Sequence, residues 1–97
     1  MGVRITGLGK AVPNQVLTNE EISKMVDTSD DWIKSRTGIE RRHVAVTETT
    51  NELASQAAIE ALAAAGVSSD EIDLIIVATV SPDTAMPSTA CLVARKI

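Results

Sequence analysis

The chain has 97 residues, which limits it to one domain of modest size. Hydrophobic residues make up 44% of the sequence, a content that predicts a folded globular chain rather than a disordered one. The formal net charge of −4 disfavours nucleic acid as a partner, because neutralising phosphates requires a basic surface. Trp is the only aromatic residue type present, so the core must be built from Ala, Val, Ile and Leu.

One cysteine, Cys91, and one histidine, His43, restrict the available chemistry. A lone cysteine forms no internal disulfide, which fits a reducing cytoplasm, and no metal-ligand spacing surrounds one Cys and one His. The longest apolar run, residues 74–78, is far too short to span a bilayer. We therefore expect a cytoplasmic protein without a bound metal and without a membrane partner.

The first predicted element in chain order is a short β-branched strand over residues 3–8. A loop over residues 9–17 is expected next. Thr18 and Glu21 then have the spacing of a capping box, which predicts a short helix through Met25.

A second short helix is predicted after Ser29, a favoured N-cap residue that two acidic residues follow. Gly38 is expected to end this helix, because glycine readily adopts the left-handed conformation of a helix terminus. Residues 39–46 alternate loosely and predict a strand or an extended arm.

Another capping box, formed by Thr49 and Glu52, predicts a long Ala-rich helix to Ala65. One helical turn is expected over residues 69–72. A strand is expected over residues 73–79, because the continuous apolar run of residues 74–78 within it is typical of a central strand buried on both faces.

The last predicted helix begins after Ser88, which follows a loop with two prolines over residues 81–87. This helix is still apolar at Ile97 and shows no stop signal. We therefore expect a truncated or incompletely ordered chain.

Gly7-Leu8-Gly9 follows the first strand, as a dinucleotide-binding loop does. The third glycine is missing, however, because Val12 stands in its place. Pro13 and Asn14 would also break the helix that must receive the pyrophosphate. We interpret the two glycines as a strand-to-loop turn.

Cys91 lies in the first turn of the last predicted helix, where a thiolate could be stabilised. A catalytic thiolate also needs a base, and His43 stands on a different segment. We expect Cys91 to be buried and structural, and His43 to be a surface or structurally satisfied imidazole. The sequence indicates no Ser-His-Asp catalytic triad and no pair of catalytic carboxylates.

Trp32 and Arg36 are four residues apart on the second helix and therefore share a face. A Trp ring can stack on adenine and an Arg can contact a phosphate, with Thr28 and Thr37 adding hydroxyls at either end. On the spacing alone, the favoured interpretation is a core Trp32 and a surface charge at Arg36. The local basic cluster could serve a small anionic ligand or form a solvated face; its members are Lys34, Arg36, Arg41 and Arg42.

Seven short segments occur in an order and at spacings that resemble one family of condensing enzymes. They are Gly-Leu-Gly-Lys-Ala-Val-Pro (7–13), Leu-Thr-Asn-Glu-Glu (17–21), Val-Asp-Thr-Ser-Asp-Asp-Trp-Ile (26–33), Arg-Thr-Gly-Ile (36–39), Glu-Arg-Arg-His (40–43), Val-Ala-Thr-Val-Ser-Pro-Asp (77–83) and Met-Pro-Ser-Thr-Ala-Cys (86–91). Over essentially all 97 residues, the chain is similar to the first third of the β-ketoacyl-[acyl-carrier-protein] synthase III family of the thiolase superfamily.

This resemblance implies an α/β, thiolase-like fold, with residues 1–97 as the N-terminal part of the first of two similar α/β halves. It also implies homodimers and an acyltransferase that condenses an acyl-CoA primer, usually acetyl-CoA, with malonyl-acyl-carrier-protein to initiate fatty acid biosynthesis. Coenzyme A enters as a thioester substrate, and no cofactor is implied. The catalytic Cys, His and Asn of the family match no residue of this chain, which alone is expected to be inactive.

For the individual residues, the resemblance implies that Trp32 stacks on the adenine of coenzyme A, with Thr28 beside that ring. It implies that Arg36 reaches the phosphates and that Thr37 lies next to them. Met86 stands where the family often has Phe, a residue that reaches toward the acyl pocket of the dimer partner. We therefore hypothesise that Met86 alters the preferred length or branching of the primer.

Two alternatives remain open. The chain could belong to a related condensing enzyme of polyketide or other secondary metabolism, because such enzymes share the fold and similar CoA segments. It could also be a non-catalytic module for coenzyme A binding or dimerisation. Against that module, the strand predicted over residues 73–79 has few neighbours to cover it, so we predict that the isolated piece is unstable.

Overall fold

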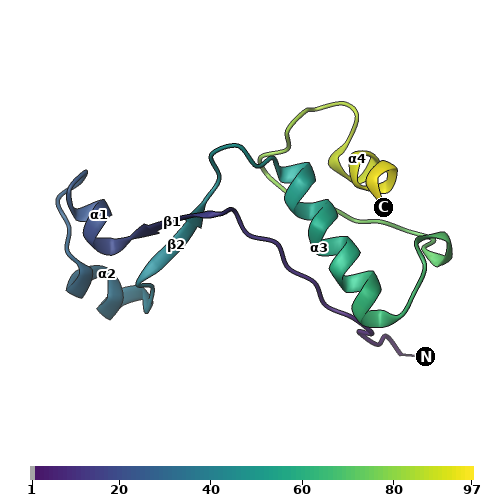
Figure 1. The fold of residues 1–97 in the computed structure, drawn as a ribbon, viewed down its shortest axis with the longest axis horizontal. Helices are drawn as coiled ribbons and strands as arrows, with labels where there is room; N and C mark the ends of the chain where they lie inside the picture. The colour runs from purple at the N-terminus through teal and green to yellow at the C-terminus, as the bar shows by residue number, and fades with distance from the viewer. Residues whose placement is uncertain (1) are drawn as a thin grey trace. The chain divides into compact units, whose positions relative to one another are not determined.

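The computed structural model describes residues 2–97 and divides the chain into two compact units. One unit comprises residues 12–47, and the other comprises the rest of the chain. Figure 1 labels the helices and strands of both. Each unit is built on its own internal contacts and is described by itself below.

The unit of residues 12–47 is a two-stranded antiparallel ribbon with two short helices inserted between its strands. Strand β1 (Gln15–Thr18) pairs with β2 (Arg41–Val44) so that the first residue of one faces the last residue of the other. Helices α1 (Asn19–Ser23) and α2 (Asp30–Thr37) lie between them in the sequence. Strand β2 confirms the predicted extended arm, whereas β1 falls in the predicted loop. That prediction was wrong because two helices separate the strands, so no hairpin turn signals the pairing.

The helix ends of this unit follow the local signals that predicted them. The Thr18 hydroxyl accepts from the Glu21 N–H at 3.2 Å, and the Glu21 carboxylate accepts from the Thr18 N–H at 2.8 Å. The Ser29 hydroxyl accepts from the Trp32 N–H at 3.1 Å and so caps α2. Gly38 ends α2 with φ of 72°, the left-handed conformation that favours glycine.

The other unit is built on helix α3 (Thr50–Ala65), against which α4 (Thr89–Lys96) packs. Thr49 opens α3 through the predicted capping box, and Gly66 closes it with φ of 66°. A single 3-10 turn, η1 (Ser69–Glu71), confirms the helical turn expected there. The Ser88 hydroxyl caps α4, also as predicted.

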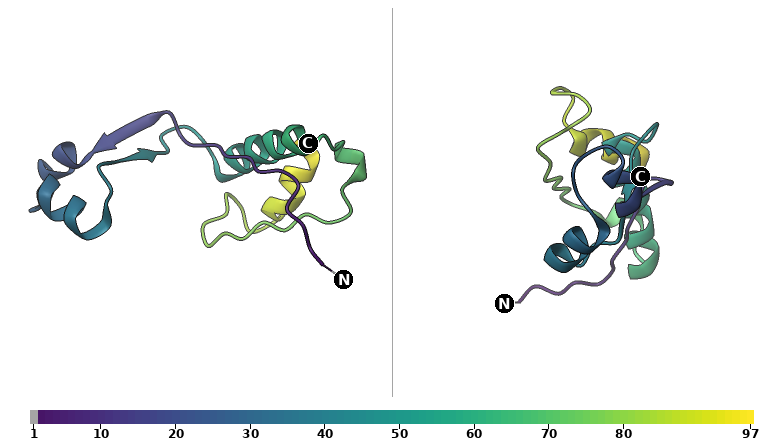
Figure 2. Two further views of the ribbon diagram at one scale, coloured as in Figure 1. Left: turned by 90° about the horizontal axis from the view of Figure 1, so that it is seen from below. Right: turned by 90° about the vertical axis from the view of Figure 1, so that its left-hand side faces the viewer.

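Residues 2–11 run beside α3, as Figure 1 and Figure 2 show. The approach is close because both segments carry small residues. A Cβ at Gly9 would collide with the Ala57 carbonyl and the Ala61 nitrogen, and one at Gly7 would collide with the Ala61 carbonyl. The two glycines therefore allow the chain to pack against the alanine face of α3. The sequence indicated only a strand-to-loop turn at these glycines and did not predict this packing.

Two predicted strands, residues 3–8 and residues 73–79, are not strands within the part of the chain that the structure describes. Both are extended, but the only ladder among residues 2–97 is the one between β1 and β2. The expectation of burial on both faces was also wrong: Leu74 is 75% and Ile76 is 81% exposed, while Ile75 between them is half-buried. A strand needs a partner, and no described segment pairs with either run.

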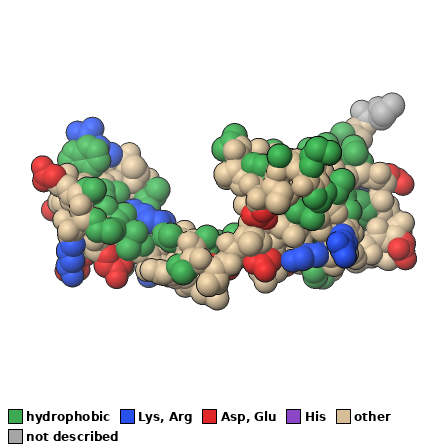
Figure 3. All heavy atoms as spheres, turned by 90° about the horizontal axis from the view of Figure 1, so that it is seen from above, with side chains coloured by type: hydrophobic (Ala, Val, Ile, Leu, Met, Phe, Trp, Pro, Cys, Tyr) green, Lys and Arg blue, Asp and Glu red, His purple; other side chains and the backbone are tan. Residues whose placement is uncertain are grey.

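The core of the larger unit centres on Val93, an α4 side chain that is 2% exposed. Many other apolar side chains remain uncovered, and Figure 3 shows such side chains on the surface of each unit. The most exposed are Val3, Ile5, Leu8, Leu74, Ile76, Val80 and Met86. None of the helices over residues 2–97 is long and apolar enough to cross a membrane.

Candidate functional site

Helix α2 places Trp32 and Arg36 on one face, as their spacing predicts. The Arg36 Cζ lies 4.6 Å from the centroid of the Trp32 ring, which is a cation–π contact. Trp32 is 55% exposed, so the interpretation of this residue as a core anchor was wrong. The neighbouring Ile33 is half-buried and takes the inward position of the helix instead.

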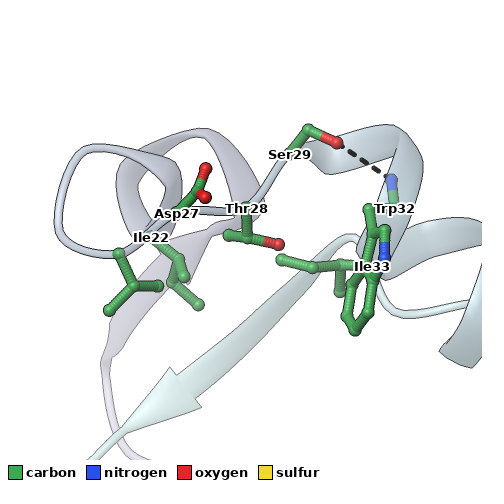
Figure 4. A pocket seen from close by; sticks show the side chains of 7 residues that line it. Ile22, Asp27, Thr28, Ser29, Trp32 and Ile33 are labelled. Carbon is green, nitrogen blue, oxygen red and sulfur yellow. Dashed lines mark hydrogen bonds between the residues drawn. The ribbon is translucent and has the colours of Figure 1, made fainter.

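An open pocket of about 650 Å³ lies beside Trp32. It is lined by Ile22, Val26, Asp27, Thr28, Ser29, Trp32 and Ile33. Figure 4 shows Thr28 between Ile22 and Trp32. Aliphatic and aromatic walls with a few polar groups suit a planar ring that carries hydrogen-bonding edges. Arg36 does not line this pocket, so its guanidinium leaves the pocket side of the indole open.

The two predicted threonine ligands differ in what their hydroxyls are free to do. Thr28 is half-buried in the pocket wall, and no described residue forms a hydrogen bond with its hydroxyl. The Thr37 hydroxyl donates to the Ile33 carbonyl at 2.7 Å and accepts from the Ile39 N–H at 3.1 Å. Thr28 can therefore donate to a ligand, whereas Thr37 has its proton committed to the end of α2.

The basic residues near α2 are divided between structural and available roles. The Lys34 ammonium lies 2.7 Å from the Glu40 carboxylate, and this hydrogen bond, together with the charge of Glu40, raises the pKa of Lys34. Arg42 donates to the side chain of Asn19 at 2.6 Å. Arg36, by contrast, forms no ion pair with any described residue. Its guanidinium remains available for a phosphate.

Sequence reasoning missed Asn19, whose side chain is 1% exposed and fully bonded. Its Nδ2 donates to Asp30 Oδ1 at 2.8 Å and to the Ile39 carbonyl at 2.7 Å, and its Oδ1 accepts from Arg42. Asn19 is the first residue of α1, directly after the N-cap Thr18, and an Asn at a helix N-terminus is common enough that the sequence gives no local signal. The partners are distant in sequence, so spacing does not reveal them.

Met86 lies in the other unit, in the loop of residues 81–87, and is 87% exposed. Asp83 ties this loop to the start of α3, because its two carboxylate oxygens accept from the Thr50 N–H at 2.9 Å and the Asn51 N–H at 2.7 Å. These N–H groups have no partner within the helix. The loop is thus fixed at one point while the Met86 side chain stays uncovered.

His43 and Cys91 have no catalytic surroundings. His43 is exposed, and its Nδ1 lies 2.8 Å from the Pro13 carbonyl, so Nδ1 carries the proton and the imidazole is structurally satisfied, as interpreted. Cys91 is exposed, so its predicted burial was wrong. Thr89 and Val93 form the buried face of α4, and Cys91 lies midway between them, on the opposite face. Residues 2–97 contain no group of three or more His, Cys, Asp or Glu that could hold a metal ion.

No protein-family profile matches the chain. Similar proteins and similar solved structures were found, and they are condensing enzymes of one kind. A β-ketoacyl-[acyl-carrier-protein] synthase III of Xanthomonas campestris is 56% identical over 95 residues, which cover 97% of this chain and 29% of that protein. The 3-oxoacyl-[acyl-carrier-protein] synthase III of Aquifex aeolicus has a TM-score of 0.94 at 52% identity, covering 98% of this chain and 31% of that one. The priming β-ketosynthase of the R1128 polyketide pathway has a TM-score of 0.91 at 33% identity, covering 96% of this chain and 28% of its own.

The chain spans less than a third of the length of each of these proteins. Their agreement confirms the α/β, thiolase-like fold that the sequence motifs predicted. Over nearly its whole length, the chain is therefore similar in sequence and in fold to one segment of the β-ketoacyl-[acyl-carrier-protein] synthases III.

Proposed function

We propose that this chain supplies the coenzyme A-binding helix of a β-ketoacyl-[acyl-carrier-protein] synthase III. Such an enzyme condenses an acyl-CoA primer, usually acetyl-CoA, with malonyl-acyl-carrier-protein and so initiates fatty acid biosynthesis. The observation that carries the proposal is the exposed Trp32, which stands beside an open pocket and one helical turn from the unpaired Arg36. An exposed indole without a protein partner other than this cation is suited to stack on a ligand ring.

In this proposal the adenine stacks on the pocket side of the Trp32 indole, which Arg36 does not cover. The unbonded Thr28 hydroxyl contacts the edge of the adenine ring. Arg36 donates its guanidinium N–H groups to the phosphates, which are anionic and well matched to that planar fork. Thr37 lies next to the phosphates and offers an acceptor lone pair rather than a proton.

The complete enzyme would work as a cytoplasmic homodimer with acyl-CoA and the acyl carrier protein as its partners. It would use coenzyme A as a thioester substrate and no further cofactor. In the family, a Cys takes the acyl group from acyl-CoA and free coenzyme A leaves. The malonyl group then loses CO2, and the resulting carbanion attacks the Cys thioester and releases the Cys, with a His and an Asn assisting this second step. Those three residues match none of residues 1–97, so we expect this chain alone to be inactive.

Met86 is proposed to reach toward the acyl pocket of the dimer partner. Its 87% exposure and the anchored loop around it support this role, because an uncovered apolar side chain on a fixed loop can enter a neighbouring pocket. The replacement Met86→Phe should change the preference among straight and branched acyl-CoA primers. An unchanged preference would contradict a role in primer selection.

The test is a condensation assay with the protein at the full length that its gene encodes. Acetyl-CoA and malonyl-acyl-carrier-protein should give acetoacetyl-acyl-carrier-protein, detected by intact mass. Calorimetric titration with coenzyme A measures binding separately. If the protein binds coenzyme A but forms no condensation product with any acyl-CoA in a panel of primers, the result would instead indicate the non-catalytic module.

A second candidate is a condensing enzyme that primes a polyketide or another secondary metabolite. The likeness to the R1128 priming β-ketosynthase, with its TM-score of 0.91, favours keeping it. The same assay separates the two candidates. A polyketide priming enzyme should prefer a carrier protein from a biosynthetic cluster over the carrier protein of fatty acid synthesis.

A further inference from the structure

We propose that Asn19 is a positioning residue for the coenzyme A site, because its single side-chain amide holds both ends of helix α2. This inference rests on the proposed function, which places Trp32 and Arg36 of that helix against coenzyme A. Among the described residues, the hydrogen bonds of Asn19 go to Asp30, Ile39, Glu40 and Arg42, and not to Trp32 or Arg36. The effect of Asn19 on the ligand would be exerted through the orientation of α2.

The geometry of the amide carries the proposal. One Nδ2 hydrogen bond, of 2.8 Å, goes to Asp30, the first residue of α2. The other, of 2.7 Å, goes to the carbonyl of Ile39, two residues beyond the last residue of α2. The segment that leaves the helix and the residue that starts it are therefore joined through one planar group.

The third bond fixes this amide to the strand ribbon. Arg42 of β2 donates from Nη2 to Asn19 Oδ1 at 2.6 Å and from Nη1 to the Leu17 carbonyl of β1 at 3.2 Å. The backbone N–H of Asn19 also donates to the Glu40 carbonyl at 3.0 Å. The amide orientation is unambiguous, because a flipped amide would set its NH₂ against the Arg42 donor and its oxygen against two acceptors.

Helix α2 has little else to hold it in place. None of its eight residues is fully buried and only Ile33 is half-buried, so apolar packing alone contributes little to fixing its orientation. The side chain of Asn19 is 1% exposed, so water cannot readily replace the bonds that it makes. Without this amide, the Arg42 guanidinium and the Ile39 carbonyl lose a partner, and the angle at which α2 presents its ligand face relaxes.

The experiment compares Asn19→Ala and Asn19→Asp with the wild-type full-length protein. Asn19→Asp keeps an acceptor for Arg42, but it loses both donors and sets a second carboxylate against Asp30. Both variants should bind coenzyme A about tenfold more weakly, because hydrogen-bond losses of this kind correspond to roughly one decade in an equilibrium constant. The KM for acyl-CoA should rise by a similar factor, whereas kcat at saturating acyl-CoA should change far less.

Rescue distinguishes positioning from general destabilisation. Adding Asp30→Asn to Asn19→Asp provides an amide at position 30 that can donate to the carboxylate at position 19, so much of the lost affinity should return. Asn51→Ala is the matched control, because it removes an amide that accepts a hydrogen bond from Ser55 in the other unit. That variant should bind coenzyme A as the wild type does.

Folded Asn19 variants that bind coenzyme A like the wild type would overturn the inference alone. A parallel fall in kcat and affinity without rescue by Asp30→Asn would also overturn it. A wild-type protein that binds no coenzyme A would overturn the proposed function, and the inference with it. If neither Asn19 variant folds, Asp30→Ala breaks the bond at the start of α2 with Asn19 intact, and unchanged coenzyme A affinity in that variant counts against the inference.

Discussion

The Arg36 guanidinium lies over the Trp32 indole, with 4.6 Å between its Cζ and the ring centroid. One helical turn separates the two residues on α2, and both side chains are exposed. The contact keeps a cation and an aromatic surface together without burying either. Such a pair restricts the rotamers of both side chains before any ligand arrives, so less entropy is lost when a ligand binds.

Replacing Trp32 by Ala should weaken coenzyme A binding by about ten- to hundredfold, because stacking on an aromatic side chain contributes roughly 1–3 kcal/mol per base. Trp32→Phe should retain part of the affinity. Calorimetric titration with coenzyme A measures the loss, and pantetheine, which lacks the adenine, serves as the control ligand. Equal losses for both ligands would show that Trp32 supports the fold rather than the adenine.

Arg36→Ala should weaken coenzyme A binding by about tenfold, since charge-assisted bonds to phosphate are among the stronger hydrogen bonds. It should also make the affinity less dependent on salt. Arg36→Lys should recover only part of the loss, because an ammonium lacks the planar fork. Titrations from low to high salt check both expectations.

Lys34 is the matched control on the same helix, because Lys34→Ala removes the same charge from a residue that is already paired with Glu40 at 2.7 Å. Glu40 raises the pKa of Lys34. The stability that depends on the Lys34 charge is therefore fully present below the unfolded lysine pKa of about 10.4 and is lost as pH rises through the higher folded value. Coenzyme A affinity of Lys34→Ala should stay within about twofold of the wild type between pH 6 and 8. A loss as large as that of Arg36→Ala would mean that net charge, not contact, sets the affinity.

The helix boundaries could be predicted from the sequence because the signals for them are local. Thr18, Ser29 and Thr49 each sit within three residues of the N–H that they cap. Burial follows a different rule, because it depends on which segments come together. Residues 73–79 look like a buried strand by composition, yet burial of both faces requires partner strands at the edges and packed layers above and below, and the described chain provides no partner strand.

In the candidate site, too, the features set by local sequence could be predicted, whereas those set by distant segments could not. The spacing of Trp32 and Arg36 on one helix was enough to predict that they share a face. Their exposure was not predictable from that spacing, and the family resemblance was needed to favour a ligand. Asn19 escaped prediction because its partners lie 11, 20 and 23 residues away in the sequence.

Asp83→Asn should lower the free energy of unfolding by about 0.5–1 kcal/mol, because a carboxylate at a helix N-terminus interacts favourably with the dipole and the free N–H groups. The amide keeps one acceptor for Thr50 or Asn51 but cannot serve both. Thermal unfolding measures the change. Asp73→Asn removes the same charge from a residue without a hydrogen bond in the described chain, so it should be nearly neutral. Equal effects of the two variants would mean that Asp83 does not hold the loop of residues 81–87.

Gly9→Ala should destabilise the fold by about 1–3 kcal/mol, as overpacking of a close contact does. The added Cβ would meet the Ala57 carbonyl and the Ala61 nitrogen of α3, and these backbone atoms cannot move aside as a flexible side chain can. Gly2→Ala is the matched control, because nothing lies within 4 Å of a Cβ at that position. Neither glycine has a positive φ, so both substitutions cost little in backbone strain, and any difference between the variants reports packing alone. If Gly9→Ala and Gly2→Ala unfold at the same temperature, residues 2–11 do not lie against α3 in solution, since no arrangement in contact with that helix backbone could accept the methyl group without loss.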